Sequence, residues 1–302
     1  MVDQPEFDRQ PPETGKLERL SPLVSRLIAP NAGPFTFTGT CTYIVGDRDL
    51  VVIDPGPDDA AHGERILKNI GTSRLAAILV THTHRDHSPL AARLKSLTGA
   101  PIMGCGPHRA ARALSEGEIN PLDASSDHDY QPDRILDDGE GISFGSLEFE
   151  TIATPGHTMN HLAFALKEEK ALFSGDHVMG WSTSIVAPPD GAMRPYMDSL
   201  ERLIARDDHI YYPGHGEAVK APGRFVPQLL AHRRLRETSI AEAIRDGVET
   251  IPDLVKKLYS GLDPRLHGAA ALSVFAHLED LVARDIVRAD ESLSLKARFY
   301  PR

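Results

Sequence analysis

With 302 residues, the chain can bury a sizeable core and exceeds the usual size of one domain, which favours a large domain plus a small one. Its 41% hydrophobic and 25% charged residues are typical of a soluble globular protein, and no apolar run approaches the roughly 20 residues that a membrane helix needs. The net charge of −10 disfavours nonspecific capture of nucleic acid, without excluding a local cationic site.

The N-terminal segment, residues 1–20, carries three prolines and many charges and is expected to form an arm. Its first residues are acidic and polar, with neither the basic start nor the apolar stretch of a secretory signal. We therefore expect a cytoplasmic protein that has no membrane association.

Residues 21–223 contain short runs rich in Val, Ile and Leu, with amphipathic stretches at 62–70, 88–98 and 197–206. The runs come in consecutive groups and also alternate with helical patterns. This order predicts an α+β domain with helices outside its sheets, and not a simple doubly wound parallel sheet.

Five of the strand-like runs in this region end at a histidine or an aspartate. Neighbouring strands bring their ends to one edge of a sheet, so these side chains are expected to meet there. The pattern therefore predicts one metal site. The five residues are Asp54, His82, His157, Asp176 and His215.

The second run opens into a loop, residues 82–87, with the sequence His-Thr-His-Arg-Asp-His. Alternate residues of this loop can point the same way, and four ligand-type side chains in six positions suffice for more than one ion. Ser88 is predicted to cap the next helix, with Pro89 as its first residue. The loop would then be held by a strand at one end and a helix at the other. Such a loop suits a metal site, because misplaced ligands bind poorly.

Residues 105–140, rich in Pro, Asp, Ser and Gly, are predicted to form a surface insertion with a short helix at 108–114. Trp181, the one tryptophan, follows Asp176 closely. Together with Ser182 and Thr183 it is a candidate for lining the substrate pocket, and core packing is the alternative for Trp181.

Residues 224–302 have helical periodicity at 225–246 and 252–260 and a third apolar helical face from Leu272 to Val282. Two short strands, 286–289 and 294–300, follow around a polar turn, so we expect a small winged-helix-like domain. Basic residues of this domain are candidate phosphate contacts, although solvated helix faces are the favoured interpretation at a net charge of +2. They are Arg233, Arg234, Arg236, Lys256 and Lys257.

The two cysteines, Cys41 and Cys105, lie far apart and are expected to be buried free thiols. A metal would then be held by nitrogen and oxygen, which suits zinc first and leaves iron or manganese open. His161 is a candidate outer partner of the ligands. The remaining histidines are expected at the surface or in the core.

These motifs, in this order, resemble the metallo-beta-lactamase superfamily, over residues 24–221. The sequences Thr-His-Thr-His-Arg-Asp-His-Ser, Thr-Pro-Gly-His-Thr and Phe-Ser-Gly-Asp, with the C-terminal module, are most similar to the beta-lactamase-like protein 2 subgroup. The resemblance implies an αββα sandwich with metals at one edge of the paired sheets. It also implies a hydrolase.

Carried over by position, the resemblance implies two zinc ions. One would be held by His82, His84 and His157. The second would be held by Asp86, His87 and His215, with Asp176 bridging the ions. Asp54 would order the metal-binding loops and would not itself be a ligand.

Zinc lowers the pKa of bound water to about 7, so a metal-bridging hydroxide would be available at neutral pH. It would attack an ester, thioester, lactone or phosphodiester, and Asp86 could assist proton transfer. The expected substrate is a small molecule or an acyl thioester, with single-stranded RNA as an alternative because the subgroup includes an endoribonuclease.

Other functions remain open at this point. A glyoxalase-like thioesterase and an iron-dependent sulfur dioxygenase use the same central motif, whereas His84 in place of Glu argues against oxygen reduction of the flavodiiron type. A regulator that binds nucleic acid and keeps a vestigial metal site is the non-enzymatic alternative. The apolar faces of the C-terminal helices also leave a homodimer open.

Overall fold

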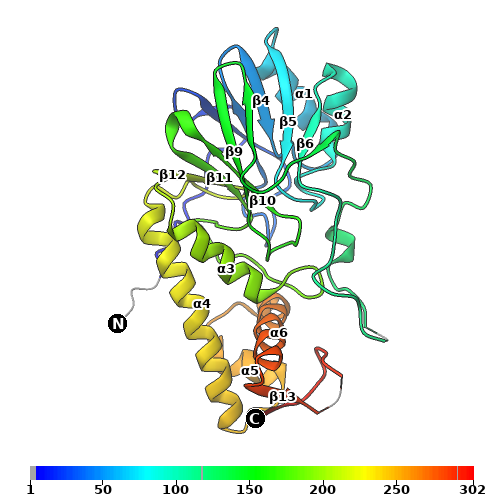
Figure 1. Cartoon of the computed structure of the whole chain (residues 1–302), viewed down its shortest axis with the longest axis vertical. Helices are drawn as coiled ribbons and strands as arrows, with labels where there is room; N and C mark the ends of the chain where they lie inside the picture. The colour runs from blue at the N-terminus through cyan, green and yellow to red at the C-terminus, as the bar shows by residue number, and fades with distance from the viewer. Residues whose placement is uncertain (1–4, 117, 291) are drawn as a thin grey trace.

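The computed structural model describes residues 5–116, 118–290 and 292–302 and has an α+β fold built around two sheets (Figure 1). The start of the predicted arm, one residue of the insertion and Glu291 of the predicted turn lie outside the described residues.

The first sheet has seven strands, which follow one another in chain order. The strands are antiparallel from β1 to β4 and parallel from β4 to β7. Helices α1 (Ala60–Ile70) and α2 (Leu90–Thr98) provide the crossovers that parallel neighbours require. The strands are β1 (Glu18–Arg19), β2 (Val24–Ile28), β3 (Cys41–Val45), β4 (Asp49–Ile53), β5 (Arg74–Val80), β6 (Ile102–Gly104) and β7 (Arg134–Ile135).

The second sheet has five strands in the order β12-β11-β10-β9-β8. All its neighbours are antiparallel except β11 and β12, which are parallel and are joined through α3 (Met193–Ile204). The strands are β8 (Gly141–Phe144), β9 (Leu147–Ala153), β10 (Leu162–Leu166), β11 (Ala171–Gly175) and β12 (Ile210–Pro213).

The two sheets pack face to face around aromatic side chains, with Tyr43 of the first sheet 5.1 Å from Phe173 of the second between ring centroids. Helices α1 and α2 cover the outer face of the first sheet, and α3 and α4 (Pro222–Arg245) cover that of the second (Figure 1). The central strands of each sheet are therefore buried on both faces and mostly apolar, whereas strands such as β1, β7 and β8 at the sheet edges are partly exposed. This is the expected αββα sandwich.

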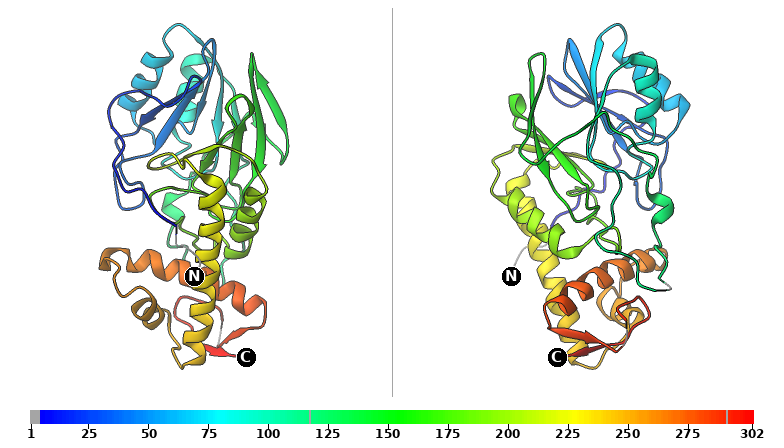
Figure 2. Two further views of the ribbon diagram at one scale, coloured as in Figure 1. Left: turned by 90° about the vertical axis from the view of Figure 1, so that its left-hand side faces the viewer. Right: turned by 45° about the vertical axis from the view of Figure 1, so that its right-hand side comes forward.

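The C-terminal part contains the second half of α4, α5 (Ile251–Leu258), α6 (His267–Ala283) and a hairpin of β13 (Val287–Ala289) and β14 (Phe299–Pro301). These elements share one apolar cluster of their own. Figure 2 shows α6 lying between the sandwich and the hairpin. Three helices closed by a hairpin agree with the predicted winged-helix-like domain, although the second strand begins later than expected.

The insertion differs from the prediction in its secondary structure. No helix forms at 108–114, and the one helical turn from 105 to 116 and from 118 to 140 is the 3₁₀ turn Asp123–Ser125. Tertiary contacts replace local ones here: the backbone N–H of Ala111 donates to the Pro189 carbonyl, and Arg112 pairs with Glu118 and Glu279. Two further 3₁₀ turns are Lys167–Glu169 and Pro264–Leu266.

The predicted capping role of Ser88 is also wrong. Helix α2 begins at Leu90, and the Ser88 hydroxyl donates to the Asp127 carboxylate at 2.6 Å in place of accepting from the helix. Ser88 therefore ties the loop 82–87 to the insertion.

Among the described residues, no helix has both the length and the apolar character that crossing a bilayer demands.

Candidate metal centre

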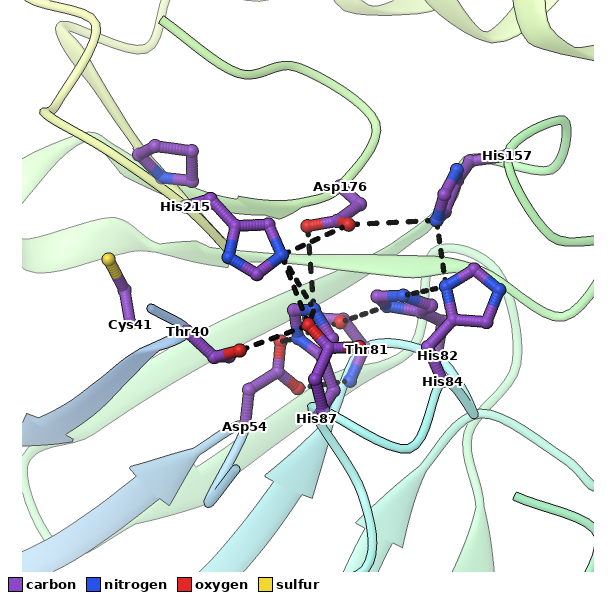
Figure 3. Close-up of polar contacts among 12 residues, drawn as sticks. Thr40, Cys41, Asp54, Thr81, His82, His84, His87, His157, Asp176 and His215 are labelled. Carbon is purple, nitrogen blue, oxygen red and sulfur yellow. Dashed lines mark hydrogen bonds and ion pairs between the residues drawn. The ribbon is translucent and has the colours of Figure 1, made fainter. Parts of the chain in front are cut away.

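The ends of four strands bring seven ligand-type side chains to one edge of the sandwich (Figure 3). From the first sheet, β5 leads into the loop 82–87, which supplies four of them. From the second sheet, β9, β11 and β12 end just before the other three. The seven residues are His82, His84, Asp86, His87, His157, Asp176 and His215.

One group of imidazoles converges on His84. Its Nδ1 atom lies 3.1 Å from Nε2 of His82 and 3.0 Å from Nε2 of His157. His82 is fully buried and His157 is 8% exposed. Three ring nitrogens from two sheets therefore point into one small volume, which is the arrangement of a three-histidine metal site.

A second group lies beside the first and combines two imidazoles with a carboxylate. Nε2 of His87 and Nε2 of His215 are 3.4 Å apart, and Asp86 Oδ2 lies 3.3 Å from the former and 3.2 Å from the latter. Asp176 stands between the groups, with Oδ2 3.6 Å from His157 Nε2 and 3.4 Å from His215 Nε2. Its carboxylate can reach both groups.

Asp54 anchors the loop 82–87 from the end of β4. Its carboxylate accepts hydrogen bonds from the backbone N–H of Thr81 at 2.8 Å and from the Thr81 hydroxyl at 2.7 Å, and it lies 2.9 Å from Nδ1 of His87. A left-handed backbone at Asp54, with φ of 48°, places this residue, and Asp tolerates that conformation better than most residues. Asp54 thus holds one imidazole and the start of the loop.

The other imidazoles are held by backbone atoms and by a histidine. Nδ1 of His157 lies 2.6 Å from the Ile185 carbonyl, and Nδ1 of His215 lies 3.3 Å from the Gly39 carbonyl. His161 accepts the backbone N–H of Asp176 at 3.2 Å, and its ring stacks on His82. Such contacts set ring orientation, which is the role expected of His161.

The electrostatics differ between the two groups. Burial, together with neighbouring imidazoles, holds the pKa of His82 well below its usual range and lowers the pKa of His84 to about 3. In the second group burial acts in the same direction, but Asp176 and Asp86 overcome it and raise the pKa of His215 to about 9. Their carboxylates also raise the pKa of His87.

This donor set fits divalent cations. Three neutral lone pairs face one another in the first group, and the carboxylates of half-buried Asp86 and buried Asp176 face imidazoles of the second. Asp176 Oδ1 is buried and receives no hydrogen bond from the described residues, and His87 Nε2 lies 3.5 Å from it. A buried carboxylate oxygen that lacks a hydrogen bond is costly. Nitrogen and carboxylate ligands without thiolate suit zinc, iron or manganese.

Two residues of the centre escaped the sequence analysis. The Thr40 hydroxyl donates to Asp86 Oδ2 at 3.0 Å, and the Asn31 side chain makes two hydrogen bonds to Thr40, each of 2.9 Å. No motif marks either residue, because both lie outside the strand ends that carry the ligands. Only the approach of the 31–40 segment to the loop 82–87 identifies them.

A cavity of about 540 Å³ opens directly onto the metal centre. His84, Asp86, His157, Asp176 and His215 form its polar end. Its walls are mostly apolar and come from three parts of the chain, namely loops of the sandwich, the insertion and the C-terminal domain. The size lies within the range of pockets that bind small molecules.

The predicted pocket residues Trp181, Ser182 and Thr183 are not among the described residues that line this cavity, whereas Met179 and Ile185 beside them are. Trp181 stacks on Phe37 with ring centroids 4.9 Å apart, which matches its alternative role in packing. The substrate contact predicted for these three residues therefore has no support in the cavity lining.

The candidate phosphate contacts of α4 also have other partners. Arg233 is 3% exposed, hydrogen bonds to the Ser184 carbonyl and lies over the Tyr196 ring, so it is neither a phosphate contact nor a solvated side chain. Arg234 pairs with Glu201 at 2.5 Å, and Arg236 stacks on Tyr259. Arg233 and Arg236 are therefore packed within the fold, whereas Arg234 remains an exposed side chain in a surface ion pair.

Comparison with known families agrees with this geometry. The model of the metallo-beta-lactamase superfamily matches residues 35–215, more than half of the chain. The chain belongs to the metallo-beta-lactamase superfamily. The model of the beta-lactamase associated winged helix domain matches residues 250–296 of this superfamily member.

Similar proteins include a beta-lactamase-like protein 2 homolog of Caenorhabditis elegans, which is 29% identical over 81% of this chain and 79% of its own. The atrochrysone carboxyl ACP thioesterase AgnL7 of Paecilomyces divaricatus is 32% identical over 77% of this chain and 68% of its own. These relatives confirm the resemblance to the beta-lactamase-like protein 2 subgroup.

A solved metallo-beta-lactamase family protein of Thermus thermophilus has the same fold, with a TM-score of 0.76 and 22% identity over 94% of this chain and all of that one. A beta-lactamase domain protein of Burkholderia ambifaria has a TM-score of 0.79 and 19% identity over 96% of this chain and 95% of its own. Membership of the superfamily supports the expected enzyme class, a metal-dependent hydrolase.

Proposed function

We propose that this protein is a zinc-dependent hydrolase of acyl thioesters. The observation that carries the proposal is the cavity, because five of the seven ligand-type side chains form one end of it and its other walls are mostly apolar. An acyl thioester has the matching form, with a polarisable carbonyl joined to an apolar group. A relative that is named an ACP thioesterase supports the same substrate class.

In the proposed site, His82, His84 and His157 hold one ion, and Asp86, His87 and His215 hold a second, with Asp176 between them. Bound zinc ions would supply an activated water at neutral pH and polarise the substrate carbonyl. Asp86 is the proposed proton carrier, because its carboxylate reaches the cavity and accepts the Thr40 hydrogen bond. Asp54 and His161 orient the ligands from outside the cavity.

The cavity favours an acyl substrate over RNA. Among the described residues that line it, Arg265 is the one Lys or Arg, and its guanidinium is paired with Asp263 at 2.7 Å. A single-stranded RNA needs several cations along its backbone and aromatic platforms for its bases. The only aromatic ring of the lining outside the metal ligands, among the residues described, is Phe35.

The test combines metal analysis with a substrate panel. The purified protein is expected to carry two ions per chain and to release free thiol from acyl coenzyme A thioesters, and chelation should abolish release until zinc is restored. Asp86→Ala and His84→Ala should each lose metal and at least about a thousandfold in kcat/KM. Asp207→Ala, at an exposed aspartate that pairs with Lys170, serves as the control.

Two outcomes would overturn the proposal. One is full thioester hydrolysis by the chelated protein or by the Asp86→Ala variant. The other is cleavage of single-stranded RNA by a protein that leaves every thioester of the panel intact.

A further inference from the structure

The wall of the cavity that faces the metal centre comes from the C-terminal domain. It is formed by Ile251 and Pro252 at the start of α5 and by Gly268, Ala271 and Leu272 near the start of α6. The views in Figure 2 show α6 running beneath the sandwich. The winged-helix-like domain therefore contributes directly to the space in which a substrate would lie.

The start of α6 and its later turns have different partners. Gly268, Ala271 and Leu272 are spaced i, i+3 and i+4 and so share one face of the helix, which borders the cavity. Val274, Phe275 and Leu278 belong to the apolar cluster of the C-terminal domain. Phe275 lies four residues beyond Ala271 and continues the same face, and Ala271 itself also packs against that cluster. The start of α6 thus borders the cavity, whereas its later turns pack within the C-terminal domain.

Three ion pairs from different elements hold α6 in position. Glu279 pairs with Arg112 of the insertion at 2.7 Å, and Asp280 pairs with Arg194 of α3 at 3.2 Å. Arg284, just after the helix, pairs with Glu237 of α4 at 2.6 Å. These pairs tie the C-terminal end of α6 to the insertion, to α3 and to α4, whereas the opposite end of the helix borders the cavity.

Gly268 has no conformational reason to be glycine. It is the second residue of α6 and has no left-handed backbone, and a Cβ atom added there would meet no atom within 4 Å. Glycine disfavours a helix relative to alanine, and here no close packing offsets that cost. What the missing side chain provides is open space at the wall of the cavity.

We propose that Gly268 and Ala271 of α6 set the length of the acyl group that the active site accepts. This inference rests on the proposed thioesterase function and assigns the specificity to the C-terminal domain. The occupant is the uncharged, apolar acyl portion of the thioester, because the wall offers aliphatic contacts and its one arginine is paired. A bulkier side chain at 268 would shorten the cavity without disturbing the metal ligands.

The experiment compares butanoyl, octanoyl, dodecanoyl and hexadecanoyl coenzyme A as substrates of the metal-loaded protein. Gly268→Phe is expected to lower kcat/KM for the longest substrate by about tenfold or more, while butanoyl turnover stays near that of the unaltered protein. Gly268→Ala, which favours the helix, should show a small shift in the same direction. Circular dichroism verifies that both variants fold.

Ala283→Phe is the matched control, since Ala283 is exposed at the opposite end of α6 and does not line the cavity. A fluorescent long-chain fatty acid gives a second readout, its Kd, that does not depend on hydrolysis. Gly268→Phe should weaken its binding by about tenfold, whereas Ala283→Phe should not.

The outcomes separate the two proposals. If thioesters are hydrolysed but Gly268→Phe changes neither the chain-length profile nor the fatty-acid Kd, the role of α6 is wrong. If the fatty acid binds in a manner that depends on position 268 and no thioester is hydrolysed, the cavity assignment stands and the proposed reaction fails.

Discussion

At the scale of single residues, the contacts of Thr40 decide that its hydroxyl donates a hydrogen bond to Asp86 of the metal centre. The Asn31 amide donates to the Thr40 hydroxyl oxygen, which leaves the hydroxyl proton for Asp86. Thr40 can therefore present only a donor to the carboxylate, which favours its charged form. Contacts of this kind commonly change metal affinity by ten- to a hundredfold.

Thr40→Val should therefore lower the affinity for the second ion and the kcat/KM by about tenfold or more, with little change in overall stability. Metal titration and thioester turnover measure the two effects. Thr38→Val is the matched control, because the Thr38 hydroxyl is buried and has no hydrogen-bond partner among the described residues. Equal metal affinity in the two variants would contradict the role assigned to Thr40.

At the scale of elements, the turn after β9 packs closely against the first half of α3. The backbone N–H of Ala192 donates to the Gly156 carbonyl, and the Ser199 hydroxyl donates to the Pro155 carbonyl. A Cβ atom at Gly156 would lie 2.3 Å from Cα of Tyr196, and φ there is 141°. Gly156 is thus required both for the backbone conformation and for contact between turn and helix, and His157 follows directly.

Gly156→Ala should destabilise the fold by at least about 2 kcal/mol and lower metal occupancy by displacing His157. Urea unfolding and metal analysis test the two parts. Gly139→Ala isolates the backbone effect, because Gly139 has a positive φ of 75° but open space around the added Cβ. The steric explanation fails if both variants lose the same stability and retain their metal.

At the scale of the whole molecule, one helix joins the two cores. Phe225 and Leu229 in the first half of α4 belong to the cluster beneath the second sheet, and Ile240 and Ile244 belong to the cluster of the C-terminal domain. The expected domain boundary at residues 223 and 224 falls within the first turn of this helix. Because α4 is continuous, the cavity wall keeps its position relative to the metal centre.

Buried uncharged histidines couple the stability of the molecule to pH. Burial, aided by Arg65, lowers the pKa of His62 to about 4, and burial with nearby arginines lowers that of His232 to about 4. Burial also holds the pKa of His277 well below its usual range. Each of these residues binds a proton more readily when the chain is unfolded.

Acid should therefore destabilise the protein, because a folded-state pKa of about 4 lies below the ordinary 6.5 of His62. The contribution of uncharged His62 to the free energy of unfolding is fully present above about pH 6.5 and is lost as the pH falls toward 4. His62→Gln should reduce the loss of unfolding free energy between pH 7 and pH 5 by on the order of 2 kcal/mol. Urea unfolding at both values tests this, with exposed His209→Gln as control.

Local pattern was sufficient for the metal centre. His82, His157 and Asp176 each lie within four residues of the end of a strand, and strand ends at one edge of a sheet must lie near one another. Strand pairing brings His157 and Asp176 to one edge of the second sheet, and His82 joins them because the two sheets pack face to face. The residue types and their places at strand ends could be predicted from the chain alone.

Tertiary contacts decided what surrounds that centre. Ser88 bonds to Asp127 and does not cap α2, Arg233 is buried over Tyr196, and Gly268 borders a cavity more than fifty residues beyond the last metal ligand. Each outcome depends on which distant segment packs nearby. Periodicity and motifs describe a residue's neighbours along the chain, whereas the cavity walls are made by neighbours in space.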